Sequence, residues 1–125
     1  MYHDWLISAS LKFPSVKVFE GTRHQLLMDL AEDHADFMAL RNTQGHQGFQ
    51  ARYDQIKKEL NLSATEICAE SWPWIKELNE IAQDMFESWE HSSGHWAVCI
   101  KVPKYFGCAM AQGKKVWYAC ILVAN

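Results

Sequence analysis

The sequence predicts an α+β fold, a three-layer α-β-α sandwich with a small antiparallel sheet of about three strands. Apolar residues recur at helical spacing through most of the first two-thirds of the chain, whereas after residue 95 the apolar period falls to two. The last stretch, 116–124, is apolar at both alternating sets of positions. A strand of that kind needs a covering layer on each of its faces, so we expect helices on both sides of the sheet.

Length and composition indicate one domain preceded by an arm. The chain has 125 residues, of which 49% are hydrophobic and 22% charged, as in ordinary globular proteins. Residues 1–20 contain Pro14 and short apolar pieces without a sustained period. We therefore expect residues 1–20 to form an extended arm that docks on this core or on a protein partner, and residues 21–125 to form a single domain.

Three long helices are expected in the first two-thirds of the domain. The first begins at Thr22, a suitable cap, and ends near residue 41. The second covers 49–60, where apolar residues lie along one side. The third begins around residues 71–73, because Pro73 suits the first turn of a helix, and its wide apolar stripe reaches Trp89.

Three strands are expected after residue 95. Residues 96–102 alternate between apolar and other side chains, and Pro103 ends that strand. Two further apolar stretches, 106–111 and 116–124, flank the turn-forming residues 112–115, which include Gly113. This arrangement is typical of a β-hairpin.

Charge and hydropathy exclude several function classes. The net charge is −3 and no basic cluster is present, which disfavours nucleic-acid binding. No apolar run approaches the ~20 residues that span a bilayer, so no transmembrane segment is expected. The first residues lack the positive leader of a secretory signal. This favours a cytoplasmic or virion-associated protein over a secreted one.

The four cysteines lack the paired Cys-x-x-Cys spacing of zinc ribbons and thioredoxin-like sites. Each lies among apolar neighbours, where cysteine behaves as a small buried hydrophobe, and we expect reduced thiols. The positions are Cys68, Cys99, Cys108 and Cys120. The hairpin could bring Cys108 and Cys120 onto adjacent strands, so a disulfide between them stays open.

Several motifs, in order along the chain, resemble the CAP superfamily of cysteine-rich secretory, antigen 5 and pathogenesis-related proteins. They are Ala31-x-x-His34-Ala35-x-x-Met38-Ala39, a loop histidine at His46, Thr65-Glu66-Ile67-Cys68-Ala69, and Trp89-x-x-Ser92-x-Gly94-His95. The resemblance covers roughly residues 22–124. It implies an α-β-α sandwich whose cleft is lined by two histidines and acidic residues.

Carried over by position, His46 and His95 would be the two cleft histidines, and Glu66 the glutamate of the family's Gly-Glu-Asn segment. Thr65 and Ile67 replace the glycine and asparagine of that segment. The family's second glutamate and its N-terminal helix motif have no clear counterpart. Two imidazoles and a carboxylate would suit zinc or another divalent metal with one open position, so we expect His46, His95 and Glu66 as metal ligands.

Each candidate residue also has a plainer interpretation. Glu66 could complete a capping box with Ser63, three residues earlier. His46 lies between Gly45 and Gln47, and a solvated loop histidine is the default there. His95 enters the expected buried strand beside Trp96, where its ring could simply hydrogen-bond to the backbone. His34 falls on the buried stripe of the first helix, where we expect its ring to bond to a neighbouring loop and to serve the core.

The sequence favours a CAP-like binding or interaction module, and we expect a non-enzyme rather than an enzyme. Family members bind lipids, glycans, metals and proteins, so the fold does not choose between a small-molecule and a lipid ligand. The alternative is a structural subunit of a larger assembly, such as a virus or phage particle, with a vestigial cleft. A third hypothesis is a metal-dependent hydrolase with Glu66 as the base.

Overall fold

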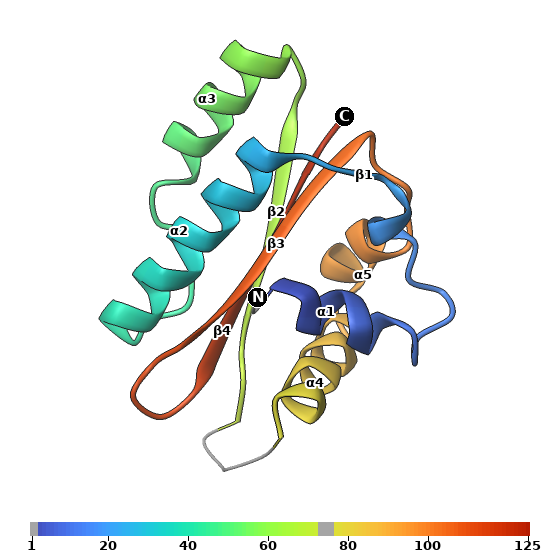
Figure 1. The fold of residues 1–125 in the computed structure, drawn as a ribbon, viewed down its shortest axis with the longest axis vertical. Coiled ribbons are helices and arrows are strands. Elements are labelled where there is room, and N and C mark those ends of the chain that lie inside the picture. The colour runs from blue at the N-terminus through green and yellow to red at the C-terminus, as the bar shows by residue number, and fades with distance from the viewer. Residues whose placement is uncertain (1–2, 73–76) are drawn as a thin grey trace.

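The computed structural model describes residues 3–72 and 77–125, which form helices around one mixed sheet (Figure 1). The elements in chain order are α1 (His3–Ser10), the short 3₁₀ helix η1 (Val18–Glu20), β1 (Thr22–Arg23), α2 (Gln25–Arg41), α3 (Phe49–Leu60), β2 (Ala64–Glu70), α4 (Leu78–Glu90), α5 (Ser93–Cys99), β3 (Tyr105–Gln112) and β4 (Trp117–Ala124). Helices α2 and α3 cover one face of the sheet, and α1, α4 and α5 cover the other.

The predicted α+β sandwich is confirmed, but its sheet has four strands, not three. The strand order is β1-β3-β4-β2. β3 pairs antiparallel with β4 as the hairpin pattern predicted, and β2 pairs antiparallel with the other edge of β4. The two-residue strand β1 runs parallel to β3, which makes the sheet mixed. Such a short strand leaves no periodic signal in a sequence.

The prediction of a strand over 96–102 is wrong, because this segment begins with helix α5. Trp96, Val98 and Cys99 all pack into the core around α4, and a short apolar run of this kind fits a helix as well as a strand. The third long strand is β2, which contains Glu66. The predicted capping box of Ser63 and Glu66 is therefore wrong as well.

The prediction of an extended arm over residues 1–20 is also wrong, because residues 3–10 form helix α1. Leu6 is completely buried and Ala9 is nearly so, and both lie in the core that α4 and the sheet form. Eight residues are too few for a periodicity argument, and α1 is held by tertiary packing. The N-terminal segment is thus part of this chain's own core.

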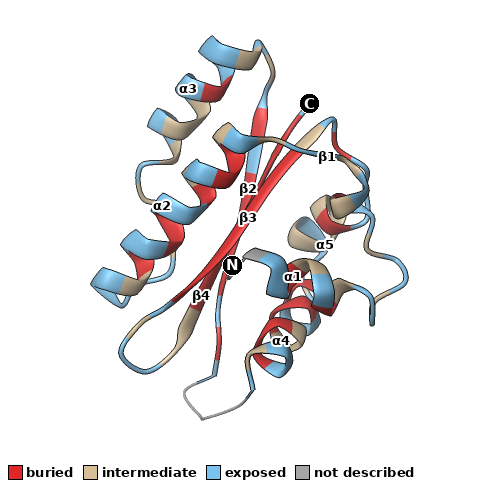
Figure 2. Ribbon diagram, in the orientation of Figure 1, coloured by how far each residue is buried: buried red, intermediate tan, exposed pale blue. Residues whose placement is uncertain are grey.

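Two hydrophobic cores lie on the two faces of the sheet, as Figure 2 shows by the buried strands and inner helix faces. The prediction that the last strand is covered on both faces is confirmed. Ile121 and Val123 of β4 point to the core of α1, α4 and α5, and Cys120 and Leu122 point to the core of α2 and α3. This alternation decides which side chains can meet at the candidate site.

The predicted helices over 22–41 and 49–60 correspond to α2 and α3. α2 begins after His24, whose ring Nδ1 accepts a hydrogen bond from the Leu26 amide, and not after Thr22. The predicted start of the third helix includes residues 73–76, which lie outside the described residues, and α4 is described from Leu78. Among the helices of 3–72 and 77–125, none combines the length and apolar character that crossing a membrane demands.

We expect Leu6→Ala to lower the free energy of unfolding by about 2–5 kcal/mol, because it empties a fully buried volume. Leu11→Ala is the matched control, since Leu11 is 82% exposed just beyond the same helix. Urea denaturation of both variants measures the difference. Equal stabilities for the two variants would contradict the packing of α1 on the core.

Candidate functional site

A buried carboxylate, Glu66, is the centre of a polar cluster on the α2 and α3 side of the sheet. Its side chain is only 1% exposed. Arg52 from α3 donates two hydrogen bonds to it, from Nε to Oε2 at 2.7 Å and from Nη2 to Oε1 at 2.8 Å. The Nδ1 atom of His46 lies 2.9 Å from Oε1. Two-point binding by an arginine is the strongest common pairing for a carboxylate.

The loop between α2 and α3 is fastened to the same cluster. The Nη1 atom of Arg52 donates to the carbonyl of Gln47 at 2.7 Å. Gly48 precedes α3 with φ = 74°, a left-handed backbone conformation that glycine adopts without strain. The loop can therefore turn sharply enough for Arg52, one turn into α3, to reach back and hold it.

His34 behaves as the sequence predicted, because its ring bonds to a neighbouring loop. Nε2 lies 2.7 Å from the carbonyl oxygen of Gly45, and since a carbonyl only accepts, Nε2 carries the proton. The same nitrogen lies 3.8 Å from Oε1 of Glu66. His34 thus closes the cluster from the α2 side.

Opposing effects set the charges of the cluster. Burial by itself would raise the pKa of Glu66, but hydrogen bonds from Arg52 and His46 outweigh it and hold the pKa below its usual value. Burial disfavours a charged ring at His34, yet its bonds to Cys68 and to Gly45 raise its pKa. The carboxylate is therefore ionised at neutral pH, and Arg52 balances its charge.

Cys68 brings a sulfur donor to the cluster. Its Sγ lies 3.7 Å from Oε1 of Glu66 and 3.8 Å from Nδ1 of His46. Ligand atoms of His34, Glu66 and Cys68 all lie within 4.8 Å of one another, so this buried group could hold a metal ion. Nitrogen, oxygen and sulfur together suit zinc by donor type.

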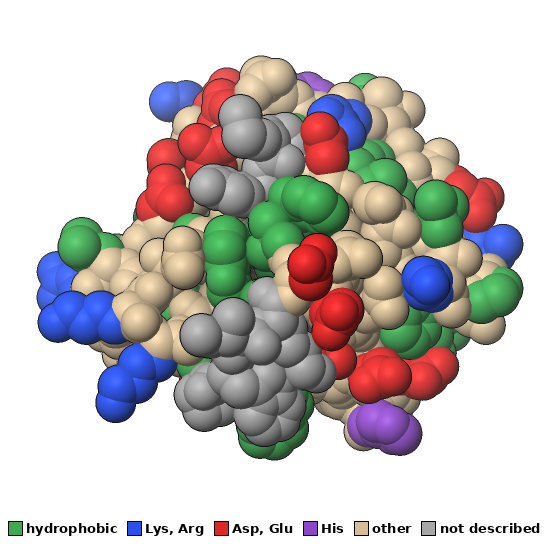
Figure 3. Space-filling model, turned by 60° about the horizontal axis from the view of Figure 1, so that its bottom comes forward, with side chains coloured by type: hydrophobic (Ala, Val, Ile, Leu, Met, Phe, Trp, Pro, Cys, Tyr) green, Lys and Arg blue, Asp and Glu red, His purple; other side chains and the backbone are tan. Residues whose placement is uncertain are grey.

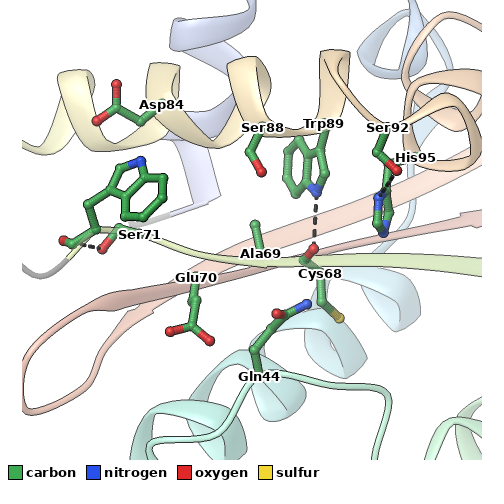
Figure 4. A pocket seen from close by; sticks show the side chains of 11 residues that line it. Gln44, Cys68, Ala69, Glu70, Ser71, Asp84, Ser88, Trp89, Ser92 and His95 are labelled. Carbon is green, nitrogen blue, oxygen red and sulfur yellow. Dashed lines mark hydrogen bonds between the residues drawn. The ribbon is translucent and has the colours of Figure 1, made fainter.

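A cavity of about 490 Å³ opens at the edge of the sheet beside β2. Figure 4 shows that Ser88 and Trp89 approach it from α4, Ser92 from the turn that follows and His95 from α5. Gln44 and Cys68 lie on the other side of β2. The cavity thus extends around the edge strand, and its described wall combines apolar surface with several polar and charged side chains. The lining residues are Gln44, Cys68, Ala69, Glu70, Ser71, Trp72, Asp84, Ser88, Trp89, Ser92 and His95.

Hydrogen bonds fix the wall of the cavity. Trp89, fully buried on α4, donates from Nε1 to the carbonyl of Cys68 at 3.0 Å and so ties the helix to the edge strand. His95 Nδ1 lies 2.8 Å from the hydroxyl oxygen of Ser92. The hydroxyl of Ser71 accepts from the amide of Trp117 at 2.8 Å, which closes the end of the β2–β4 ladder.

The structure brings together two of the three predicted metal ligands. His46 and Glu66 are hydrogen-bonded on the α2 and α3 side of the sheet. His95 belongs to α5 on the opposite side, where it lines the cavity, whereas His46 is not among the described residues of that wall. The two imidazoles thus flank the same sheet edge from opposite faces.

Sequence reasoning missed Arg52, Cys68 and Gln44. A single arginine on an amphipathic helix reads as a solvated residue, and nothing near Arg52 marks it as the partner of a buried carboxylate. Cys68 was expected as a small buried hydrophobe. The available signal was Glu66 itself, which stands two positions before Cys68 in an apolar stretch. A glutamate that is buried in such a strand needs a cation beside it.

No protein-family model matches the chain, and no curated protein matches it either. The likeness to the CAP superfamily therefore rests on the quoted motifs alone, and what it implies is carried into the proposals below.

We expect Arg52→Ala to lower the free energy of unfolding by about 3–5 kcal/mol, because it leaves the buried charge of Glu66 without its partner. The double variant Arg52→Ala, Glu66→Gln should recover a large part of that loss, since a neutral amide costs less to bury. Chemical denaturation of the single and double variants measures the coupling. Additive losses would show that the ion pair does not act as a unit.

Proposed function

We propose that the chain is a CAP-like binding module whose ligand site is the cavity at the β2 edge, and that its ligand is a small molecule with an ammonium group. The observation that carries the proposal is the cavity itself. Its volume of about 490 Å³ lies in the range of small-molecule sites, and several polar groups converge on it. The motifs quoted above support the CAP-like assignment.

The charge of the wall favours a cation. Glu70 and Asp84 both line the cavity, and none of its described lining residues is Lys or Arg. The exposed indole of Trp72 also contributes to the wall, and an aromatic face attracts an ammonium group. The carboxylate of Glu70 in the wall would repel an anion.

The surface around this end of the molecule supports the same choice. In Figure 3 one group of acidic side chains lies at the upper left of the face shown and another at its lower right, and several basic side chains gather at the left edge. The chain as a whole carries a net charge of −3. A net negative charge raises the local concentration of a cationic ligand near the protein.

The alternative of an assembly subunit loses one of its supports. That support was an apolar N-terminal arm expected to dock on a neighbour, but Leu6 and Ala9 of that segment are buried in this chain's own core. The hydrolase is also disfavoured. A general base works best with a pKa near the working pH, and Arg52 keeps the pKa of Glu66 low.

A titration with choline, monitored by the backbone amide resonances of the protein, tests the proposal. We expect saturable shifts at Glu70, Ser88 and His95, and no comparable shifts with acetate or glucose. Glu70→Gln should weaken choline binding by about tenfold, equal to ~1.4 kcal/mol, because it removes one attractive charge.

Glu87→Gln is the matched control, since Glu87 is an exposed carboxylate on α4 outside the described wall of the cavity. It changes the net charge by the same amount and should leave choline binding unchanged. Equal weakening by the two variants would mean that only the overall charge matters. The absence of shifts at the cavity residues would refute the proposed ligand class.

Metal binding is the second candidate function, favoured by the buried group of His34, Glu66 and Cys68. Zinc there would displace the proton of His34 Nε2 and would compete with Arg52 for the carboxylate of Glu66. The proton on His34 and the guanidinium of Arg52 therefore both lower the affinity of the site for zinc. Zinc binding should strengthen as the pH rises, because binding releases protons from the ligands.

Calorimetric titration of the reduced protein with Zn²⁺ tests this candidate. We expect one site that Cys68→Ala and His34→Gln abolish and His95→Ala leaves intact, because His95 lies on the other face of the sheet. Loss of zinc in His95→Ala would instead support the set predicted from the sequence, His46, Glu66 and His95. No heat of binding in the wild type would remove metal binding altogether.

A further inference from the structure

Two cysteines face each other across the β2–β4 ladder. Cys68 on β2 is the register partner of Cys120 on β4. Residues directly opposite in an antiparallel pair alternate between hydrogen-bonded pairs and non-hydrogen-bonded pairs, in which the side chains are closer. Which kind of pair the two cysteines form decides whether their sulfurs can be joined.

The hydrogen bonds at the end of the ladder settle this question. Ser63 and Asn125 exchange both backbone hydrogen bonds at 3.0 Å, so they are a hydrogen-bonded pair. The kind of pair alternates with each step along the ladder. Positions 65, 67 and 69 therefore belong to hydrogen-bonded pairs, and positions 64, 66 and 68 belong to non-hydrogen-bonded pairs. Cys68 and Cys120 therefore form a non-hydrogen-bonded pair.

Such a pair has dimensions that a disulfide can span. Its Cα atoms lie about 4.5 Å apart, near the lower end of the ~4.4–6.8 Å found in disulfides. Both side chains point to the same face, since Cys68 and Cys120 belong to the core of α2 and α3. In the structure both are free thiols.

The other two cysteines lack this arrangement. Cys108 is opposite Ile121, and it points to the core of α1, α4 and α5, whereas Cys120 points to the other face. The disulfide between Cys108 and Cys120 that the sequence left open is therefore excluded by the register. Burial raises the pKa of Cys99 and of Cys108 to about 12, so both stay protonated.

The two paired thiols differ in their position relative to the cavity. Cys68 is among the residues that line it, although its exposed fraction is only 2%, whereas Cys120 is 0% exposed and is not a lining residue. A small molecule in the cavity therefore reaches Cys68 before Cys120.

We propose that Cys68 and Cys120 form a dithiol redox site that reacts with a low-mass disulfide entering the cavity. The inference rests on the strand register and on the lining of the cavity, and it does not depend on the ligand proposed above. Its function is reversible oxidation of this chain at the wall of the binding cavity.

The reaction is two successive exchanges. The Cys68 thiolate attacks one sulfur of the small disulfide, the bond between its two sulfurs breaks, and one small thiolate leaves with the electron pair. The Cys120 thiol then loses its proton and attacks the Cys68 sulfur, which releases the second small thiol. The two protein thiols are oxidised to one disulfide, and the small disulfide is reduced to two thiols.

Treatment of the folded, reduced full chain with oxidised glutathione tests the proposal. We expect the intact mass to fall by two hydrogen atoms and peptide mapping to link the β2 and β4 segments. In Cys120→Ala the reaction should instead stop at one glutathione attached to Cys68, because the resolving thiol is absent. Cys68→Ala should give neither the disulfide nor the glutathione adduct. Cys108→Ala is the control, in which the β2–β4 link should still form.

Alkylation of the wild-type protein by iodoacetamide, followed by site-resolved mass spectrometry, keeps the test independent of whether the variants fold. Cys68 should react first because it lines the cavity, while Cys99 and Cys108, which are buried and do not line it, should react only when the protein is unfolded. Labelling of Cys68 no faster than Cys99, or glutathione-driven links to other cysteines, would overturn the proposal.

Discussion

The buried ion pair of Glu66 and Arg52 is the constraint on which the polar half of this molecule depends. A carboxylate that is 1% exposed is tolerated inside a core only when a cation and hydrogen bonds replace the lost water. Arg52 supplies the charge from α3, and His46 and His34 surround the carboxylate from the loop and from α2. Three separate segments are thereby drawn to one strand.

The same pairing fixes the loop that reaches the cavity. Arg52 uses its remaining guanidinium nitrogen to hold the carbonyl of Gln47, and His34 holds that of Gly45. Gln44, which lines the cavity, immediately precedes Gly45. A change in the charge of the buried cluster would therefore alter the position of Gln44 in the cavity wall.

Cys68 contributes to both the Glu66 cluster and the cavity wall. Its side chain contacts the cluster around Glu66, while its carbonyl accepts the indole N–H of Trp89 in the wall of the cavity. One residue can contact both sites because the side chains of an edge strand point to the faces of the sheet, whereas its free backbone groups point outward from the edge. Oxidation at Cys68 would therefore act on a residue that both sites share.

Long elements with a clear period could be predicted from the sequence, and short ones could not. α2, α3 and the β3–β4 hairpin follow from apolar spacing, and so did the bond of His34 to a loop. α1, α5 and β1 have two to eight residues each, so tertiary packing determines their structure. Gly107 is a further case. A Cβ there would collide with the backbone of Leu27, so α2 can pack on β3 only because this residue is glycine.

The relation between His46 and His95 marks the limit of prediction from residue types. Both histidines approach β2, but the alternation of side chains along that strand sends Glu66 and Cys68 toward His46, and Ile67 and Ala69 toward the layer that carries His95. The face is decided by the register of β2 on β4, and the register cannot be known until β2 is recognised as a strand. A site built from several segments thus depends on one assignment in the edge strand, and an error there moves every ligand to the wrong face.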